Sequence, residues 1–143
     1  MTKTADRANA PENAARLLLR RAVRGALATS EVSTNPERQG GPAASLITVA
    51  TDGRGQPLFL LSDIAHHTQN LKADARAALL IDETAGFDNP QAGPRATFVG
   101  KIKLTRRGED RRRFLARHPD AAGYAEFADF NFYQMAVERV HHV

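Results

Sequence analysis

The sequence predicts a mainly β fold of the α+β class, a six-stranded antiparallel barrel with peripheral helices. Short apolar and β-branched stretches recur along the chain, and turns rich in glycine, proline and aspartate separate them. The helical segments do not alternate regularly with these strands, so hairpin connections are expected rather than βαβ units. The six expected strands are residues 25–30, 43–51, 57–62, 76–82, 96–105 and 130–140.

The first element is predicted to be a helix that begins at Pro11. Proline suits the first helical turn, and apolar side chains then recur on one face while arginines lie away from it. These apolar residues are Ala14, Ala15, Leu18, Leu19, Ala22 and Val23. Gly25 is the expected stop signal, and the polar residues 1–10 are expected to form a frayed, disordered tail.

Two of the strands have distinct patterns. Residues 43–51 are apolar or β-branched almost throughout, as in a strand that is covered on both faces. Residues 96–105 alternate most clearly from one face to the other. The remaining helical patterns, outside the strands, are residues 65–74, 108–117 and 120–127.

The composition is that of one globular domain, residues 1–143. The chain has no cysteine, no run of eighteen apolar residues and no apolar N-terminal segment, so a cytoplasmic protein without a membrane partner is expected. A net charge of +4 and a pI of about 10.0 favour anionic partners. The arginines between residues 106 and 117 have the spacing of a solvated helix face. They lack interleaved aromatic residues, so nucleic-acid binding is not expected.

The most informative segment for chemistry is residues 57–82. A buried strand ends at Ser62, and a helix opens close behind it with His66, His67 and Thr68. The N–H groups of a helix N-terminus bind anions, and hydroxyl and imidazole groups add donors for a phosphate. The competing interpretation is an ordinary helix start, capped by Ser62 or Asp63.

Four segments carry a resemblance to a known family. They are ARLLLRRAVRGALAT (15–29), AASLITVATDGRGQPLFLLSDIAHHTQNLKADARAALL (43–80), GPRATFVG (93–100) and RFLARHPDAAGYAEFADFNFYQM (113–135). In this order and spacing the chain resembles the FMN-binding split barrels of the pyridoxamine 5'-phosphate-oxidase-like superfamily, and among them the haem-utilisation proteins of the HugZ type. The HHTQN and RHPDA elements are the most specific. The resemblance implies a six-stranded antiparallel split β-barrel, in agreement with the strand pattern.

The resemblance also implies a cofactor site for FMN. The phosphate is expected near the end of a barrel strand and the helix that follows, where oxidases of the superfamily have an Arg-Lys pair in place of His66-His67. A second strand is expected along the flavin ring, and Arg95 is expected to reach the flavin or its phosphate across a dimer interface. The implied cofactor-binding residues are Ser45, Leu46, Ile47, Thr48, Ser62, His66, His67, Thr68, Asn70 and Arg95.

The function implied in this way is a flavin-dependent oxidoreductase with an unknown small-molecule substrate, built as a homodimer with two equivalent sites. No catalytic acid or base stands out in the sequence. Pyridoxamine-phosphate oxidase activity itself is not expected, because the C-terminal Trp and Arg of those oxidases are missing and the chain has no tryptophan. A weaker third possibility is a dimer without a cofactor that serves only as a binding module.

The alternative cofactor is haem, as the HugZ-type resemblance implies. Haem needs an axial ligand, and His141 or His142 could supply it, although a chain end is expected to be mobile. No separate metal site is expected. Neighbouring histidines on a strand point to opposite faces, and no HExxH spacing occurs.

Overall fold

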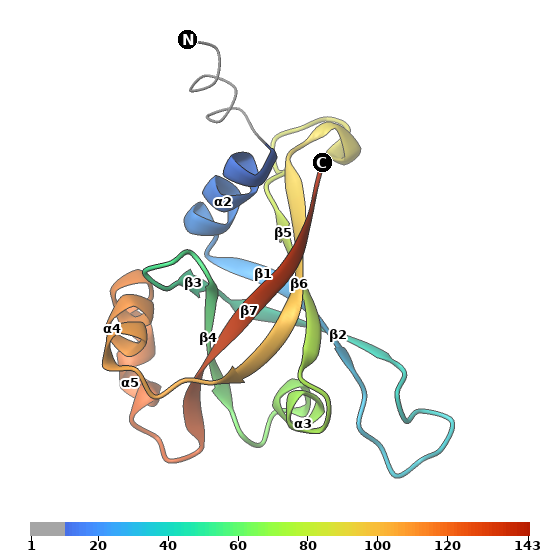
Figure 1. The fold of residues 1–143 in the computed structure, drawn as a ribbon, viewed down its shortest axis with the longest axis vertical. Coiled ribbons are helices and arrows are strands. Elements are labelled where there is room, and N and C mark those ends of the chain that lie inside the picture. The colour runs from blue at the N-terminus through green and yellow to red at the C-terminus, as the bar shows by residue number, and fades with distance from the viewer. Residues whose placement is uncertain (1–10) are drawn as a thin grey trace.

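The computed structural model describes residues 11–143 (Figure 1), so the tail predicted for residues 1–10 lies outside the described residues. The described residues form strands β1 (Arg24–Ser30), β2 (Pro42–Thr48), β3 (Ala50–Thr51), β4 (Pro57–Ser62), β5 (Arg76–Asp82), β6 (Arg95–Leu104) and β7 (Phe130–His142). Their α-helices are α2 (Pro11–Arg21), α3 (His66–Ala73), α4 (Gly108–Arg117) and α5 (Ala122–Ala125), with short 3-10 helices at Pro90–Ala92 and Pro119–Ala121. The expected mainly β architecture with peripheral helices is confirmed. Within residues 11–143, no helix is both long enough and apolar enough to cross a membrane.

The strands make one antiparallel sheet in the order β2-β1-β5-β6-β7-β4-β3. β2 and β3 stand at the two edges of this sheet, yet only Val49 separates them in the chain. The sheet therefore curls so that its edges meet at Val49 (Figure 1). The expectation of six strands is wrong, because the described residues form seven and the single strand expected at 43–51 is two.

Val49 explains the break between β2 and β3. Its N–H donates a hydrogen bond to the carbonyl of Val23 at 3.0 Å, and its carbonyl accepts one from Nε2 of His118 at 2.7 Å. Its side chain is fully buried in the core. Because both backbone groups are bonded away from the strand ladder, the chain changes its pairing partner here, from β1 to β4.

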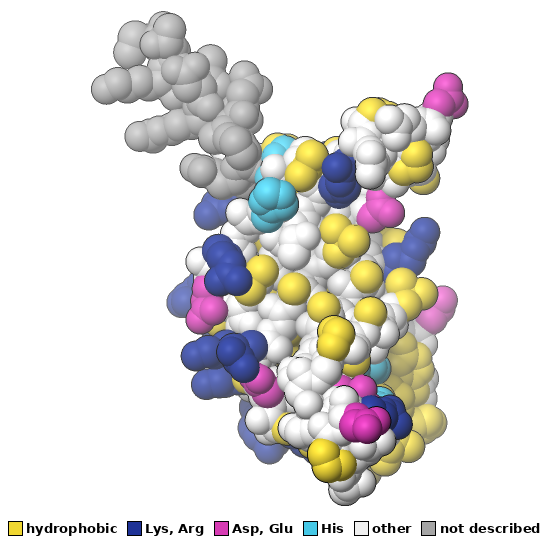
Figure 2. All heavy atoms as spheres, turned by 90° about the vertical axis from the view of Figure 1, so that its right-hand side faces the viewer, with side chains coloured by type: hydrophobic (Ala, Val, Ile, Leu, Met, Phe, Trp, Pro, Cys, Tyr) yellow, Lys and Arg dark blue, Asp and Glu magenta, His cyan; other side chains and the backbone are white. Residues whose placement is uncertain are grey.

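The outer face of β2 corrects a second expectation, that this strand is covered on both faces. Alternate residues of β2 are exposed, and the side chain of Leu46 is 76% exposed. The helices lie elsewhere, α2 and α4 on one side of the barrel and α3 at one end, so no element of the described chain covers this face (Figure 1). Figure 2 shows the side of the molecule that lies at the right of Figure 1, where hydrophobic side chains gather over the centre and basic side chains lie along one edge.

Two apolar cores hold the elements together. The larger fills the barrel and receives the buried face of α2, with Leu18 and Leu19 packed among strand residues such as Leu27 and Phe59. The smaller lies under α4 and α5, where the ring of Phe114 packs edge-on against another aromatic ring 5.7 Å away, that of Phe132.

The first helix ends earlier than expected. α2 stops at Arg21, and Gly25 lies inside β1 rather than at the helix end. A Cβ atom at Gly25 would lie 2.9 Å from the carbonyl oxygen of Leu80, so glycine permits the close approach of β1 and β5. Gly25 is therefore not the helix stop that the sequence predicts. It allows β1 and β5 to pack closely.

The last strand is longer than expected. β7 continues through His142, because Ala96 and Thr97 of β6 pair with His142 and His141. Backbone bonds between Arg95 and Val143 extend the contact to the last residue. Both histidines therefore sit in a paired strand, and the strand expected at 130–140 is two residues longer at this end.

Candidate functional site

Five of the predicted cofactor residues lie together where β4 ends and α3 begins. They are Ser62, His66, His67, Thr68 and Asn70. The connection is tight, because the N–H of Ala65 donates to the carbonyl of Ser62 at 3.1 Å and the next helical turn starts at once. The structure thus groups the residues around one helix N-terminus, as the resemblance implies.

Two of these five side chains are already engaged within the protein. The Ser62 hydroxyl donates to Oδ2 of Asp129 at 2.7 Å. The Asn70 amide donates to the Thr29 hydroxyl at 3.1 Å, and its oxygen accepts from the N–H of Val32 at 2.9 Å. Asn70 therefore fastens α3 to the end of β1, and it holds the scaffold rather than facing a ligand.

The other three are unequal as phosphate ligands. His66 is exposed, whereas His67 is half-buried, and its pKa is lowered by burial first and by the neighbouring His66 second. Its imidazole is therefore neutral at pH 7 and has a single N–H to donate. Thr68 is fully buried, and its hydroxyl oxygen has no hydrogen-bond partner in the described part of the chain. Contrary to the competing interpretation, neither Ser62 nor Asp63 caps α3, whose N-cap is Ala65.

Carboxylates surround this helix start. Asp63 accepts hydrogen bonds from the Asn131 amide at 3.2 Å and from the Tyr133 hydroxyl at 3.4 Å, and it pairs with Lys72 at 3.5 Å. Burial and the charge of Asp63 raise the pKa of Tyr133. With Asp129 beside Ser62, two carboxylates lie close to the place expected for a phosphate, and they oppose a second anion there.

The predicted residues of β2 divide between its two faces. Ile47 is buried in the core and Ser45 is half-buried on the same inner side, whereas Leu46 and Thr48 are exposed on the outer face. Successive side chains of a strand point in opposite directions. The four residues therefore cannot all present side chains to one ligand.

Arg95 lies away from the other predicted residues within one chain. It opens β6 at the end of the barrel opposite α3 (Figure 1). Its Nη1 donates to the carbonyls of Gln91 and Gly93, both at 2.9 Å, and so holds the short 3-10 helix before the strand. A contact between Arg95 and a cofactor bound at α3 would need a second copy of the chain.

The outer sheet face brings together residues that the sequence did not mark as one site. The strand register aligns two neighbouring rows across β2, β1, β5, β6 and β7. The first row is Leu46, Ala26, Leu80, Thr97 and His141, and the second is Ala44, Ala28, Ala78, Val99 and Arg139. Small and apolar side chains thus form a flat floor that ends in an imidazole and a guanidinium on β7.

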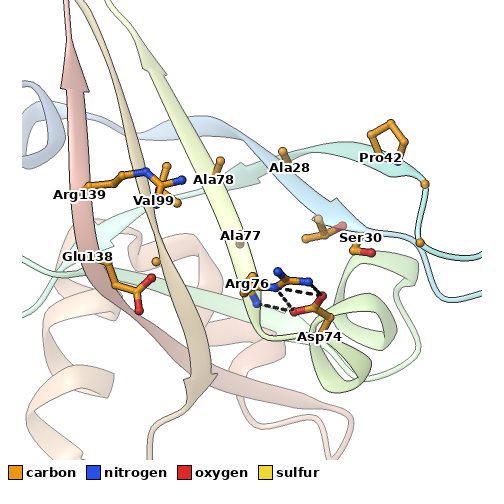
Figure 3. A pocket seen from close by; sticks show the side chains of 14 residues that line it. Ala28, Ser30, Pro42, Asp74, Arg76, Ala77, Ala78, Val99, Glu138 and Arg139 are labelled. Atoms are coloured by element: carbon orange, nitrogen blue, oxygen red, sulfur yellow. Dashed lines mark hydrogen bonds and ion pairs between the residues drawn. The ribbon is translucent and has the colours of Figure 1, made fainter.

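A cavity of about 550 Å³ opens on the second of these rows. In Figure 3 the side chains of Ala28, Ala78 and Val99 point to one side of the sheet, and Arg139 extends from β7 across Val99. The loop between β1 and β2 forms one wall with Gly41 and its neighbours. The volume lies within the range of pockets that bind small molecules and cofactors.

The charges of the cavity are divided between a closed pair and two free groups. Arg76 and Asp74 form an ion pair at 2.7 Å, and the hydrogen bonds from Arg76 lower the pKa of Asp74 to about 2. Arg139 and Glu138 are exposed and have no partner among residues 11–143. Arg139 is therefore the cation available to a ligand that lies on the apolar floor.

A β-bulge places both free groups on the cavity. Val99 pairs with Arg139 and Gly100 pairs with Val137, so Glu138 is an extra residue without a partner on β6. Bulges redirect side chains and often border functional sites. The alternation in residues 96–105 could have indicated the outward position of Val99, but the bulge and the register have no signal in the sequence.

No metal cluster accompanies either region. Within residues 11–143, no three histidine, cysteine, aspartate or glutamate side chains come together in a way that could hold a metal ion. His118, at the end of α4, bonds the carbonyl of Val49 and packs against the ring of Phe114. A histidine that binds a ligand is therefore to be sought among the other four.

Comparison with known proteins establishes the family. The family model described as CREG, beta-barrel, matches residues 5–143. The chain belongs to this CREG β-barrel family. The expected resemblance to the split barrels is confirmed by a putative pyridoxamine 5'-phosphate oxidase from Listeria innocua, whose structure superposes with a TM-score of 0.63. The superposition covers 89% of this chain and 93% of the other. At 15% identity it shows the fold alone.

Two relatives of this CREG-family chain share more of its sequence. One is the chloroplastic non-canonical heme oxygenase HOZ of Arabidopsis thaliana, 30% identical over 139 residues, which cover 92% of this chain and 42% of HOZ. The other is a heme-binding protein from Mycobacterium smegmatis, 30% identical with a TM-score of 0.83, covering 94% of this chain and 54% of that one. The chain thus spans about half the length of these relatives.

Proposed function

We propose that this chain binds haem on the outer face of the sheet, in the cavity over β1, β5, β6 and β7. Two relatives that are 30% identical are named for haem, one as a heme oxygenase and one as a heme-binding protein. The observation that carries the proposal is the combination of an apolar floor, an unpaired guanidinium and an imidazole on one sheet face.

The cavity residues fit the chemistry of haem. The porphyrin is flat and apolar, and Ala28, Ala78 and Val99 offer a floor without bulky or charged side chains. Its propionates are carboxylates, and the guanidinium group of Arg139 can bind a carboxylate with two hydrogen bonds. His141, in the neighbouring row, would offer an imidazole from a paired strand to bind the haem iron.

Bound haem would supply an iron centre for redox or oxygen chemistry. This chain's own residues would bind the propionates, exclude water from one face of the ring and hold an imidazole in place. No side chain in the cavity is placed to act as a catalytic acid or base except Glu138, which is exposed beside Arg139.

Replacing Arg139 with alanine is expected to weaken haem binding by about tenfold or more, because a charge-assisted hydrogen bond contributes about 1.5–3 kcal/mol. Haemin titration followed at the Soret band measures the affinity. Lys103→Ala is the matched control, since Lys103 is an exposed cation on β6 outside the cavity. Equal affinities of the two variants would remove Arg139 from the site.

FMN at the start of α3 is the second candidate. The observation that favours it is the buried Thr68 hydroxyl, which lacks a partner in the described residues, next to two histidines at a helix N-terminus. The carboxylates of Asp63 and Asp129 beside the same helix start count against it. FMN therefore ranks below haem, and a flavin-dependent oxidoreductase activity ranks with it.

The double change His66→Ala with His67→Ala tests this second candidate. If the histidines hold the phosphate, FMN affinity falls by about three- to tenfold while riboflavin affinity does not change. The loss should be larger at pH 6 than at pH 8: the pKa of His67 lies below its ordinary value, so its imidazolium forms only in acid. Flavin fluorescence measures both ligands, and equal losses for both would exclude a phosphate site here.

We further propose a homodimer whose interface covers the outer face around Leu46 and Leu80, beside the haem cavity. Leu46, on the edge strand β2, and Leu80, on β5, are 76% and 40% exposed on this face, and twofold dimers are the commonest oligomers. Sedimentation is expected to give twice the chain mass of 15.6 kDa, and Leu46→Glu is expected to give the single mass. A wild-type monomer at micromolar concentration would contradict the dimer.

A further inference from the structure

A second cavity, of about 330 Å³, lies on the other side of the barrel between α2, β3 and α4. Its lining is Arg20, Ala50, Thr51, Arg113, Ala116 and Arg117. It shares no residue with the cavity on the outer sheet face or with the start of α3. Three of the six lining residues of this second cavity are arginines, and none is acidic.

Two of the three guanidinium groups are oriented by backbone carbonyls. Nε of Arg113 donates to the carbonyl of Thr51 at 2.9 Å. Nη2 of Arg117 donates to the carbonyl of Arg21 and, at 3.3 Å, to that of Ala22. A guanidinium has five N–H donors, so each group keeps donors that are free for a ligand. Their positions are fixed by the chain itself, which reduces the entropy lost on binding.

The third guanidinium has no partner. Arg20 is exposed, and its side chain makes no hydrogen bond or ion pair with any other residue in the range 11–143. Two acidic side chains, Glu83 and Glu126, are paired with other arginines, Arg21 and Arg111. The cavity therefore concentrates positive charge without an internal counter-ion.

This charge is permanent and costs stability when the cavity is empty. Arg113 and Arg117 are four residues apart on α4, a spacing at which like charges repel each other. Arginine does not titrate in the physiological range, so the repulsion persists at every working pH. Ala50 and Ala116 leave space between the guanidinium groups rather than filling it.

We infer that this cavity, which we term the arginine cavity, binds the phosphate group of a small phosphorylated molecule. Phosphate oxygens match the two-pronged geometry of guanidinium groups, and Thr51 is a further polar residue in the lining. The inference is independent of the cofactor on the sheet face, because the two cavities have no lining residue in common.

Calorimetric titration of the full chain with pyrophosphate tests the inference. Arg20→Ala removes only a side chain without partners, so it should leave the fold intact and weaken binding by about tenfold. Arg16→Ala is the matched control, since Arg16 is an exposed arginine one turn earlier on α2 and does not line the cavity. The control and the double change His66→Ala with His67→Ala should both bind pyrophosphate as the wild type does.

Two further ligands define what would overturn the inference. Sulfate at the same ionic strength should bind more weakly than pyrophosphate, and equal binding would mean general attraction to a basic surface. A short DNA duplex should bind more weakly too. Tighter duplex binding, lowered equally by Arg16→Ala and Arg20→Ala, would mean a nucleic-acid surface. Absence of saturable pyrophosphate binding by the wild type would also overturn the inference.

Discussion

Replacing Ala78 with glutamate is expected to lower the affinity for haem by at least about 100-fold. Ala78 lies at the centre of the cavity floor, and its side chain points out of the sheet between Ala28 and Val99 (Figure 3). Bound haem would cover this carboxylate with its apolar ring and leave it without a partner, which costs about 3 kcal/mol or more. Such a cost corresponds to roughly two orders of magnitude in the dissociation constant.

The matched control for this change is Ala122→Glu. Ala122 is an exposed residue of α5, on the side of the barrel away from the cavity (Figure 1). Both variants gain the same charge, so a general electrostatic effect on an anionic ligand would appear in both. Unchanged haem affinity of Ala78→Glu, in a variant that melts like the wild type, would exclude the sheet face as the binding site.

Replacing Gly100 with alanine is expected to destabilise the fold by about 3 kcal/mol or more. A Cβ atom at this position would lie 2.1 Å from the carbonyl oxygen of Ala136, and a backbone atom cannot move aside as a flexible side chain can. The close approach is part of the β-bulge that turns Glu138 and Arg139 onto the cavity. The variant should therefore lose haem affinity as well as stability.

Gly123→Ala provides the control for this second prediction. Gly123 lies in α5, and a Cβ atom there meets nothing within 4 Å. Alanine is expected to stabilise the helix by up to about 1 kcal/mol. Denaturant unfolding of both variants gives the comparison, and a Gly100→Ala protein as stable as the wild type would mean that the strands separate more easily than the structure indicates.

The patterns in the sequence predict much of the fold because strand and helix periods are local properties. The alternation of residues 96–105 predicts β6, and the helical pattern after Pro11 predicts α2. The break at Val49 was not predictable, since a valine in an apolar run has no local sign of a changed partner. It depends on bonds to Val23 and His118, which are distant in the sequence.

The candidate sites were harder to predict for the same physical reason. The grouping of Ser62 with His66 and His67 followed from a strand end that leads into a helix, which is local. The carboxylate of Asp129 beside Ser62 comes from a segment 67 residues away, and it changes the electrostatics of that site. The floor of the sheet cavity combines residues from several strands, so it required the register of the whole sheet.

Parallel titrations of the purified wild-type protein with haemin and with FMN test the central claim most directly. The visible spectrum reports haem, and flavin fluorescence reports FMN. The account predicts saturable haemin binding with a sharp Soret shift, and FMN binding that is weaker or absent. Saturable FMN binding without a Soret shift on addition of haemin would contradict it and would assign the cofactor to the start of α3.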